Sequence, residues 1–201
     1  MSSSTVFSGY RWIEPLHTLT ALLEEPPVLA RFKCGSWVRD RPTEEMNPSD
    51  YLLPKPDINW TAALVEWGWL LPPKCIPICV TCFGDVFLTA ESGVYLLDLE
   101  EAAFDRYCET ESSLLRTLSQ DDDADVLLYS SLVDRLRCVG LSIDPLRCYH
   151  FKMPTILGGE VDVDNVGTNT IDERVRFCGD LHRQIKDLPD GTPVRFRVTD
   201  S

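Results

Sequence analysis

The fold is decided by two stretches near the C-terminal end, Tyr149-His-Phe-Lys-Met-Pro-Thr-Ile-Leu-Gly-Gly-Glu160 and Gly179-Asp-Leu-His-Arg-Gln-Ile-Lys-Asp-Leu-Pro-Asp-Gly-Thr-Pro193. Gly158 and Gly159, just before the end of the first stretch, can adopt positive φ where the backbone reverses. The second stretch predicts a short polar helix that a proline ends. Asp190-Gly191 then suits a tight turn into a final strand over residues 192–198. These stretches predict a turn, a helix and a closing strand, and their residues form no catalytic set.

Three apolar blocks in the middle of the chain predict β-strands at residues 76–83, 86–89 and 94–99. The turn Glu91-Ser92-Gly93 joins the last two strands as a hairpin. Before these strands, Asn59 is placed to cap a helix that runs to Trp69. The pattern therefore predicts a helix followed by neighbouring strands.

Two amphipathic helices are expected after the strands, at residues 100–118 and 124–139. Polar residues at 119–123 separate them, and Gly140 ends the second. Blocks of strands and blocks of helices in one chain are typical of an α+β fold. We expect a mixed or antiparallel sheet packed with several helices in a single compact unit.

The N-terminal part carries fewer signals. Leucines at helical spacing predict a helix at residues 16–23, and a strand is expected at 28–38. Prolines among polar residues indicate a loop at 40–57. We therefore divide the chain into an N-terminal region, residues 1–55, and an α+β domain, residues 56–201.

The charge of the chain narrows its choice of partners. Its 32 acidic and 19 basic residues give a net charge of −13. Binding to phosphate needs a basic surface, so nucleic acid is disfavoured as a direct ligand and a basic partner is favoured. No apolar run reaches the roughly 18 to 20 residues that a membrane helix needs, and no secretory signal begins the chain. We expect a cytoplasmic protein that does not bind membranes.

The cysteines favour buried thiols over a metal site. The chain has eight of them, but it is larger than a disulfide-stapled secreted domain and lacks an export signal. Cys75, Cys79 and Cys82 lie close together, yet strand alternation places the last two on opposite faces, and nothing completes a four-ligand site. We expect reduced thiols, and neither a metal nor a cofactor.

Two further groups could carry chemistry. Cys178 and His182 lie four residues apart on a predicted helix, but no orienting group or oxyanion site accompanies this pair. Asp162, Asp164 and Asn165 resemble the opening of a calcium loop, but a turn that starts a helix near residue 171 accounts for them equally. A packed helix and a turn are the favoured interpretations.

The residues of the two C-terminal stretches, and their order, resemble the C-terminal domain of bacterial immunity proteins that neutralise type VI secretion DNase toxins. That domain was formerly classed as a domain of unknown function. Upstream, Phe83-Gly84-Asp85 and Gly93-Val-Tyr-Leu-Leu-Asp98 resemble a strand and hairpin of this family and of its GAD-like companion domain. The resemblance extends over about residues 75–198, and several motifs in order outweigh any one of them. It implies a bacterial protein that binds a cognate secreted nuclease without catalysis of its own.

The acidic residues indicate where such a partner binds. Between Asp98 and Asp125 the chain holds ten acidic and two basic residues. A DNase presents a basic cleft to DNA, and long-range attraction steers an acidic surface towards it. Trp60 and Trp67 are expected in the core, which leaves Trp69 as an aromatic contact. We predict partner contacts at Glu100, Glu101, Asp105, Glu109, Asp121, Asp122, Asp123 and Trp69.

Other interpretations stay open at this point. The acidic stretch also fits the solvated face of a helix and a charged loop. The chain could be a non-catalytic regulatory binding module with a different partner. It could also be an enzyme that uses Cys178 and His182, or a metal-dependent one that uses the loop at Asp162.

Overall fold

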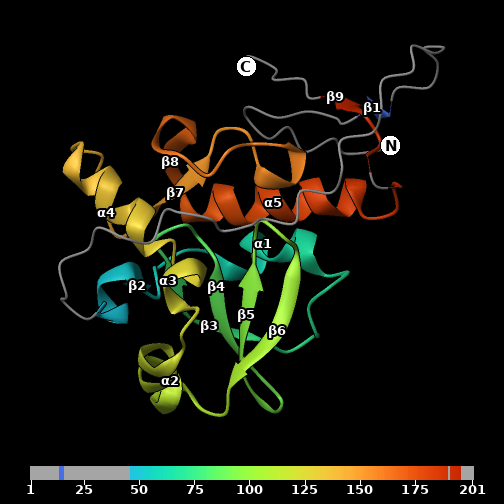
Figure 1. Ribbon diagram of the computed structural model, residues 1–201. Helices are drawn as coiled ribbons and strands as arrows, with labels where there is room; N and C mark the ends of the chain where they lie inside the picture. Colours follow the sequence, from blue (N-terminus) through green and yellow to red (C-terminus); the bar gives the residue numbers. More distant parts are fainter. Residues whose placement is uncertain (1–13, 16–45, 190, 196–201) are drawn as a thin grey trace. The chain divides into compact units, whose positions relative to one another are not determined.

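The computed structural model describes residues 14–15, 46–189 and 191–195 (Figure 1). The chain divides into two compact units, Asp40–Arg183 and a second one made of Met1–Arg39 and Gln184–Ser201. In the second unit, strand β1 (Glu14–Pro15) pairs antiparallel with β9 (Val194–Arg195). The helix expected at 16–23 and the strand expected at 28–38 lie outside the described residues, as does the end of the strand expected at 192–198.

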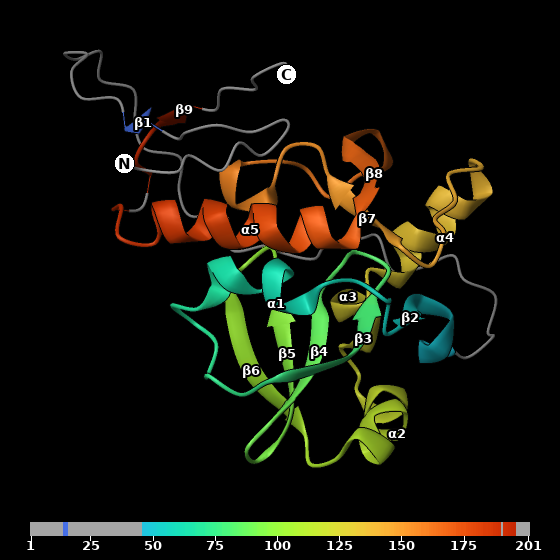
Figure 2. The ribbon, with the colours of Figure 1, turned by 180° about the vertical axis from the view of Figure 1, so that it is seen from behind.

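A five-stranded antiparallel sheet forms the centre of the larger unit, with the order β2-β3-β4-β5-β6 (Figures 1 and 2). The three strands expected in the middle of the chain are confirmed, and so is the α+β class. The short strand β2 forms one edge of this sheet and precedes the other four strands in the chain. The strand bounds are β2 Leu52–Pro54, β3 Ile76–Thr81, β4 Val86–Ala90, β5 Gly93–Asp98 and β6 Ala103–Cys108.

The helix expected at residues 100–118 is wrong in its first half, because this segment forms β6. The Asp98 carboxylate accepts the backbone N–H groups of Glu100 and Glu101, at 2.8 and 2.9 Å, and so closes a turn. Ala102 follows in the left-handed region, with φ of 53°, which no helix interior contains. The chain therefore reverses and pairs with β5. Helical structure resumes only at η3 (Glu111–Ser113) and α2 (Leu114–Gln120).

The second expected helix is broken in two, α3 (Ala124–Leu127) and α4 (Ser130–Cys138). Tyr129 separates them with a φ of 49°. Its ring lies 4.8 Å from that of Phe83 and 5.6 Å from that of Phe151, measured between centroids. Aromatic contacts in the core thus hold the residue in a strained backbone conformation. Gly140, with a φ of 82°, follows α4 as expected.

The C-terminal half of the larger unit consists of a hairpin and a long helix. Strands β7 (Arg147–Phe151) and β8 (Val166–Thr170) pair antiparallel, and α5 (Ile171–Ile185) follows at once. The expected helix start near residue 171 is confirmed, although α5 ends before Pro189. Gly158 takes the expected positive φ, 88°, whereas Gly159 does not. The shorter elements are η1 (Pro48–Tyr51), α1 (Trp60–Ala63), η2 (Val65–Trp67), η4 (Thr155–Leu157) and η5 (Val163–Asn165).

The sheet carries a hydrophobic core on each face. Phe87 of β4 points into the first core, where α2, α3 and α4 pack with the aromatic residues of β7. Its neighbours Val86 and Leu88 point into the second core, which α1, η2 and α5 cover. Helix α5 lies across one end of the sheet (Figures 1 and 2). The two faces of the sheet are therefore both covered in the layer arrangement of an α+β domain.

The tryptophans divide much as expected. Asn59 caps α1 by accepting the Ala62 N–H, but helical structure ends at Trp67 rather than Trp69. Trp67 is fully buried, and its indole N–H donates to the Val175 carbonyl of α5 at 2.7 Å. Trp60 is half-buried at the edge of the second core. The elements of the described residues include no helix long and apolar enough to cross a membrane.

Candidate interaction surface

The exposed acidic residues begin at the turn between β5 and β6. The Asp98 carboxylate closes this turn, because it accepts two backbone N–H groups. Glu101 is exposed at the tip of the turn, and Asp105 is exposed in the middle of β6. Both come from the segment that was expected to be a helix. Their positions on a turn and a strand follow from the reversal of the chain at Ala102.

A surface cavity of about 370 Å³ lies where β6 ends and α2 begins. Glu109 is exposed at this cavity, and Arg116 of α2 lines it as well. Thr110 and Ser113 form a reciprocal cap between their side chains and backbone, which fixes the corner. The residues of this cap, Thr110 and Ser113, are a pattern in the sequence from which the corner could have been predicted. The lining residues are Tyr107, Cys108, Glu109, Thr110, Ser113, Arg116 and Thr117.

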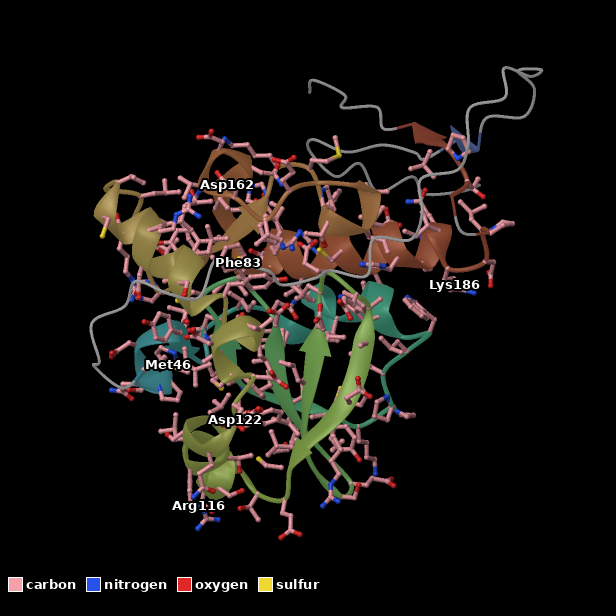
Figure 3. The ribbon with its side chains drawn as sticks, viewed as in Figure 1. Met46, Phe83, Arg116, Asp122, Asp162 and Lys186 are labelled. Atoms are coloured by element: carbon pink, nitrogen blue, oxygen red, sulfur yellow. The ribbon has the colours of Figure 1, made fainter. Side chains whose placement is uncertain are left out.

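The acidic run at residues 121–123 follows α2 directly (Figure 3). Asp121 accepts the Tyr107 hydroxyl at 2.8 Å, which ties the end of α2 to β6. Burial and this hydrogen bond raise the pKa of Tyr107, so the phenol stays protonated. Asp122 and Asp123 are exposed. Asp121 therefore positions its two neighbours and is itself half-buried.

We call Glu101, Asp105, Glu109, Asp122 and Asp123 the acidic strip. In the described part of the chain, every ion pair takes its acidic partner from elsewhere, mainly from α4, α5 and the loop at Asp162. Among the residues that the structure describes, the strip therefore takes part in no ion pair. Its negative charge attracts a basic partner from a distance, over a Debye length of about 8 Å at physiological salt.

Glu100 does not lie on this surface, contrary to its expected role as a partner contact. It is 4% exposed and forms an ion pair with Arg174 of α5, which is 2% exposed. Its second carboxylate oxygen accepts the Thr155 backbone N–H and hydroxyl, at 3.0 and 2.8 Å. The tight turn points Glu100 inward, whereas a helix would have left it beside Glu101. Reading charge along the sequence could not separate these two neighbours.

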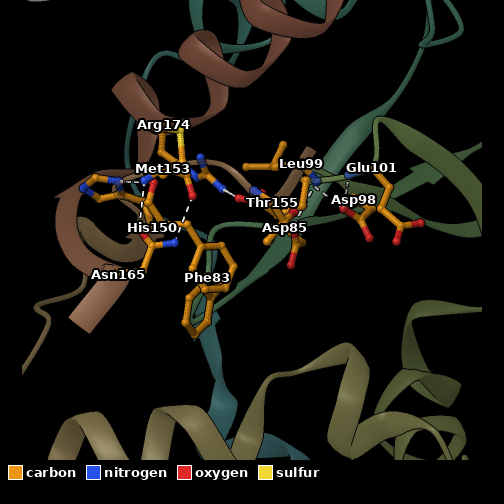
Figure 4. A network of polar contacts seen from close by, with 12 residues as sticks. Phe83, Asp85, Asp98, Leu99, Glu101, His150, Met153, Thr155, Asn165 and Arg174 are labelled. Carbon is orange, nitrogen blue, oxygen red and sulfur yellow. Dashed lines mark hydrogen bonds and ion pairs between the residues drawn. The ribbon is translucent and has the colours of Figure 1, made fainter. Parts of the chain in front are cut away.

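Asp85 is a second buried carboxylate in the same region (Figure 4). It accepts the Leu99 backbone N–H at 2.9 Å and the Thr81 hydroxyl at 3.1 Å, and so connects the start of β4 to the end of β5. Burial raises the pKa of Asp85 to about 7, and the charge of Asp98 adds to this effect. The Asp85 carboxylate therefore holds the chain in place at the start of the turn at residues 98–101, and its burial keeps it from contacting a partner.

Cys178 and His182 are both buried on α5. Burial raises the pKa of the Cys178 thiol to about 12, so the reactive thiolate is disfavoured. The His182 Nε2 atom lies 3.0 Å from the Leu99 carbonyl oxygen, and burial lowers the pKa of the imidazole. An activated nucleophile needs a lowered thiol pKa and an available base. The geometry therefore favours a structural role for both residues.

The calcium-like residues organise a loop. Asp162 begins η5 by accepting the Asp164 N–H, and its carboxylate also pairs with Arg135 at 3.1 Å. The hydrogen bond from the Asp164 backbone, and after it the one from Arg135, lowers the pKa of Asp162. The Asn165 amide donates to the carbonyls of Met153 and Glu160. Among the described residues, no group of three or more His, Cys, Asp or Glu side chains is arranged to hold a metal ion.

Trp69 is not brought to the acidic strip. Its ring stacks on Trp67 with centroids 6.2 Å apart, next to the core that α5 covers, and it is 37% exposed. Tyr107 and α2, which hold the strip, pack in the other core. The neighbouring Val65 is also exposed. Trp69 therefore lies beside the other core and away from the residues that hold the strip.

Comparison with known proteins connects the C-terminal half of this architecture to one family. No curated protein matches the chain. Residues 108–182 match the family model described as T6SS immunity protein Tdi1, C-terminal. The matched segment begins at the end of β6 and runs through α2 to His182 on α5, so the expected resemblance is confirmed there. Phe83-Gly84-Asp85 and residues 93–98 lie before it, and their GAD-like character stays a prediction. The C-terminal part of this chain is similar to the C-terminal domain of a type VI secretion immunity protein.

Proposed function

We propose that this protein is an immunity protein that binds the nuclease toxin of a type VI secretion system and neutralises it in the cytoplasm of the producing cell. The observation that carries the proposal is the match of residues 108–182 to T6SS immunity protein Tdi1, C-terminal. An immunity protein acts by binding, and the buried, protonated Cys178 is consistent with a chain that performs no catalysis.

A DNase is the toxin class that fits the charge of the protein best. The chain has a net charge of −13, and the acidic strip has no short-range compensation among the described residues. A DNase must hold a polyanion, so the surface around its cleft is basic. An acidic inhibitor is drawn to that surface quickly and can cover the cleft.

The contact surface in this proposal is the acidic strip, with Asp121 as its support. Glu101, Asp105 and Glu109 follow β6 from its start to its end, and Asp122 and Asp123 extend the surface to α2. Glu100 is excluded as a direct contact because it is buried. Trp69 supplies a second, apolar contact on the face covered by α5.

Co-expression with the product of the adjacent toxin gene tests the proposal. We expect the chain to restore growth and to co-purify with the toxin as a one-to-one complex. A folded chain that neither binds nor protects against any neighbouring nuclease would contradict it. In that case a regulatory module with another partner becomes the better interpretation.

The enzyme alternative has its own test. A Cys178→Ala, His182→Gln double variant should retain protection if it is folded, because neither side chain acts on the toxin. Its fold is checked by circular dichroism and by a cooperative unfolding transition. Loss of protection in a folded variant would favour an enzyme.

A further inference from the structure

Strand β6 (Ala103–Cys108) forms the outer edge of the five-stranded sheet, and within the described residues it pairs with β5 alone. Among the described residues, no backbone group outside β5 forms a hydrogen bond with the backbone of β6. The opposite edge, β2, is only three residues long. An exposed edge presents unpaired N–H and C=O groups, which bind another strand readily. The six-residue β6 is therefore the better template.

Acidic residues mark the whole length of this edge. Glu101 precedes β6, Asp105 lies in its middle and Glu109 follows it, and all three are exposed. The basic Arg106 lies over β5, because a Cβ atom added to Gly93 would come within 3.0 Å of its Nε atom. A second copy of this chain would bring its own Asp105 to an edge of the same charge, so self-pairing is disfavoured.

The cavity at the corner between β6 and α2 continues this edge. It begins at Tyr107 and Cys108, the last residues of β6, and includes Glu109. Its volume of about 370 Å³ can hold a long side chain. Strand-binding proteins commonly combine backbone pairing, which gives affinity, with pockets for single side chains, which give specificity.

We propose that the outer edge of β6 binds an extended, Lys- and Arg-rich segment of the toxin as an additional strand. The backbone of β6 hydrogen-bonds to the segment, and Glu101, Asp105 and Glu109 pair with its basic side chains. The corner cavity, which Glu109 and Arg116 both line, holds one further side chain of the segment. This inference rests on the proposed immunity function. It names the binding mode, which that function by itself leaves open.

Amide hydrogen exchange of the intact protein, free and bound to the cognate toxin, tests the inference. Successive residues of a strand point their N–H groups to opposite sides. We expect alternate amides of β6 to exchange at least about tenfold more slowly in the complex. The amides that already bond to β5 should change much less, and they serve as the internal control.

Proline substitutions give an independent readout. Of Asp105→Pro and Arg106→Pro, one removes an N–H that bonds to β5 and the other removes an outward N–H. Proline is tolerated at outward positions of edge strands, so one variant should keep its stability and still bind the toxin at least about tenfold more weakly. The matched control Asp105→Asn keeps the N–H and removes only the charge, so it should weaken binding less.

The outcomes separate this inference from the proposed function. If the toxin binds and the β6 amides exchange as fast as before, strand addition is wrong and the immunity function stands. If no toxin of the adjacent gene binds, both fail. Protection of β6 that depends on protein concentration without toxin would assign the edge to a second copy and overturn the inference. If both proline variants unfold, the exchange measurement on the unaltered chain decides.

Discussion

At the scale of single residues, the buried pair of Glu100 and Arg174 is the most consequential contact. Two donor atoms of the Arg174 guanidinium, Nε and Nη1, have no hydrogen-bond partner among the described residues, so the Glu100 carboxylate carries most of its compensation. Burying two charges costs free energy, and a pair offsets that cost only while both members remain. The pair thus acts as a constraint on the turn before β6.

We expect Glu100→Gln to lower the free energy of unfolding by about 3–5 kcal/mol, because it leaves the Arg174 charge buried without a partner. The double variant Glu100→Gln, Arg174→Met should lose clearly less than the two single changes added together. Urea unfolding measures each value. Arg135→Gln, which breaks an exposed pair with Asp162, is the matched control and should cost only about 0–1 kcal/mol. Equal losses in both pairs would contradict the argument.

Asp85 should make stability depend on pH. Its folded pKa of about 7 lies above the ordinary value of 3.8, so the folded state binds the proton more tightly than the unfolded state does. Its contribution therefore favours folding increasingly as pH falls from about 7 towards 4, and that contribution is lost as pH rises through 7. The neighbouring charges are Asp98, Glu100 and Arg174.

Asp85→Asn separates this contribution from that of the neighbours. The amide keeps an oxygen that can accept the Leu99 N–H and carries no titrating proton. The difference in unfolding free energy between the unaltered chain and the variant should change across pH 4–7 and level off below pH 4. A difference that is constant across this range would show that Asp85 titrates normally.

At the scale of elements, α5 is fixed against η2 by a glycine. A Cβ atom added to Gly179 would lie 2.8 Å from the Trp67 Nε1 atom and 2.9 Å from the Glu66 Cβ atom. Gly179→Ala should therefore destabilise the protein by about 1–3 kcal/mol, although alanine favours a helix over glycine by about 1 kcal/mol. Thermal unfolding measures the change. Gly140→Ala, where no atom lies within 4 Å, serves as the control, and it should cost only the strain of its positive φ.

The misassigned strand β6 shows why patterns along the chain mislead here. Val94 pairs with Cys108 and Tyr95 with Arg106, so Tyr107 is an extra residue in a bulge. Tyr107 and Cys108 consequently face the same core. A bulge breaks the alternation that identifies a strand, and the remaining apolar spacing imitates a helix. The hairpin of β4 and β5, which has no bulge, was predictable from its alternation and its turn.

The acidic charge of the candidate surface was predictable from the sequence. Which acidic residues are exposed on it was not. The sequence places Glu101, Asp105, Glu109, Asp122 and Asp123 in one acidic stretch, and the structure leaves all five exposed. Burial of a neighbouring glutamate depends on an arginine 74 positions later in the chain. Such a contact is set by tertiary structure, and no local pattern carries it. The edge position of β6 likewise follows from topology.

At the scale of the whole molecule, the acidic strip should govern how quickly the toxin binds. Exchange of Glu109, Asp122 and Asp123 for lysine should slow association at least about tenfold at low ionic strength, and much less at high salt, because exposed charges are screened. Stopped-flow association across a salt series measures this. Lysine at the exposed positions Asp57, Glu160 and Glu173 gives the same change in net charge and is the matched control. Equal slowing by both triple variants would assign the effect to net charge alone.

The ion pair between Glu100 and Arg174 also limits which parts of the gene can be exchanged by recombination. Glu100 precedes the segment that matches the immunity family, and Arg174 and Thr155 lie inside it. A recombination event that joined residues 108–182 to an unrelated partner would leave a buried guanidinium without its carboxylate. We therefore expect the hairpin before residue 108 to be inherited together with the matched segment. Under the proposed immunity function, we expect new specificities to arise by substitutions along β6 and α2 more readily than by exchange of the C-terminal segment between genes.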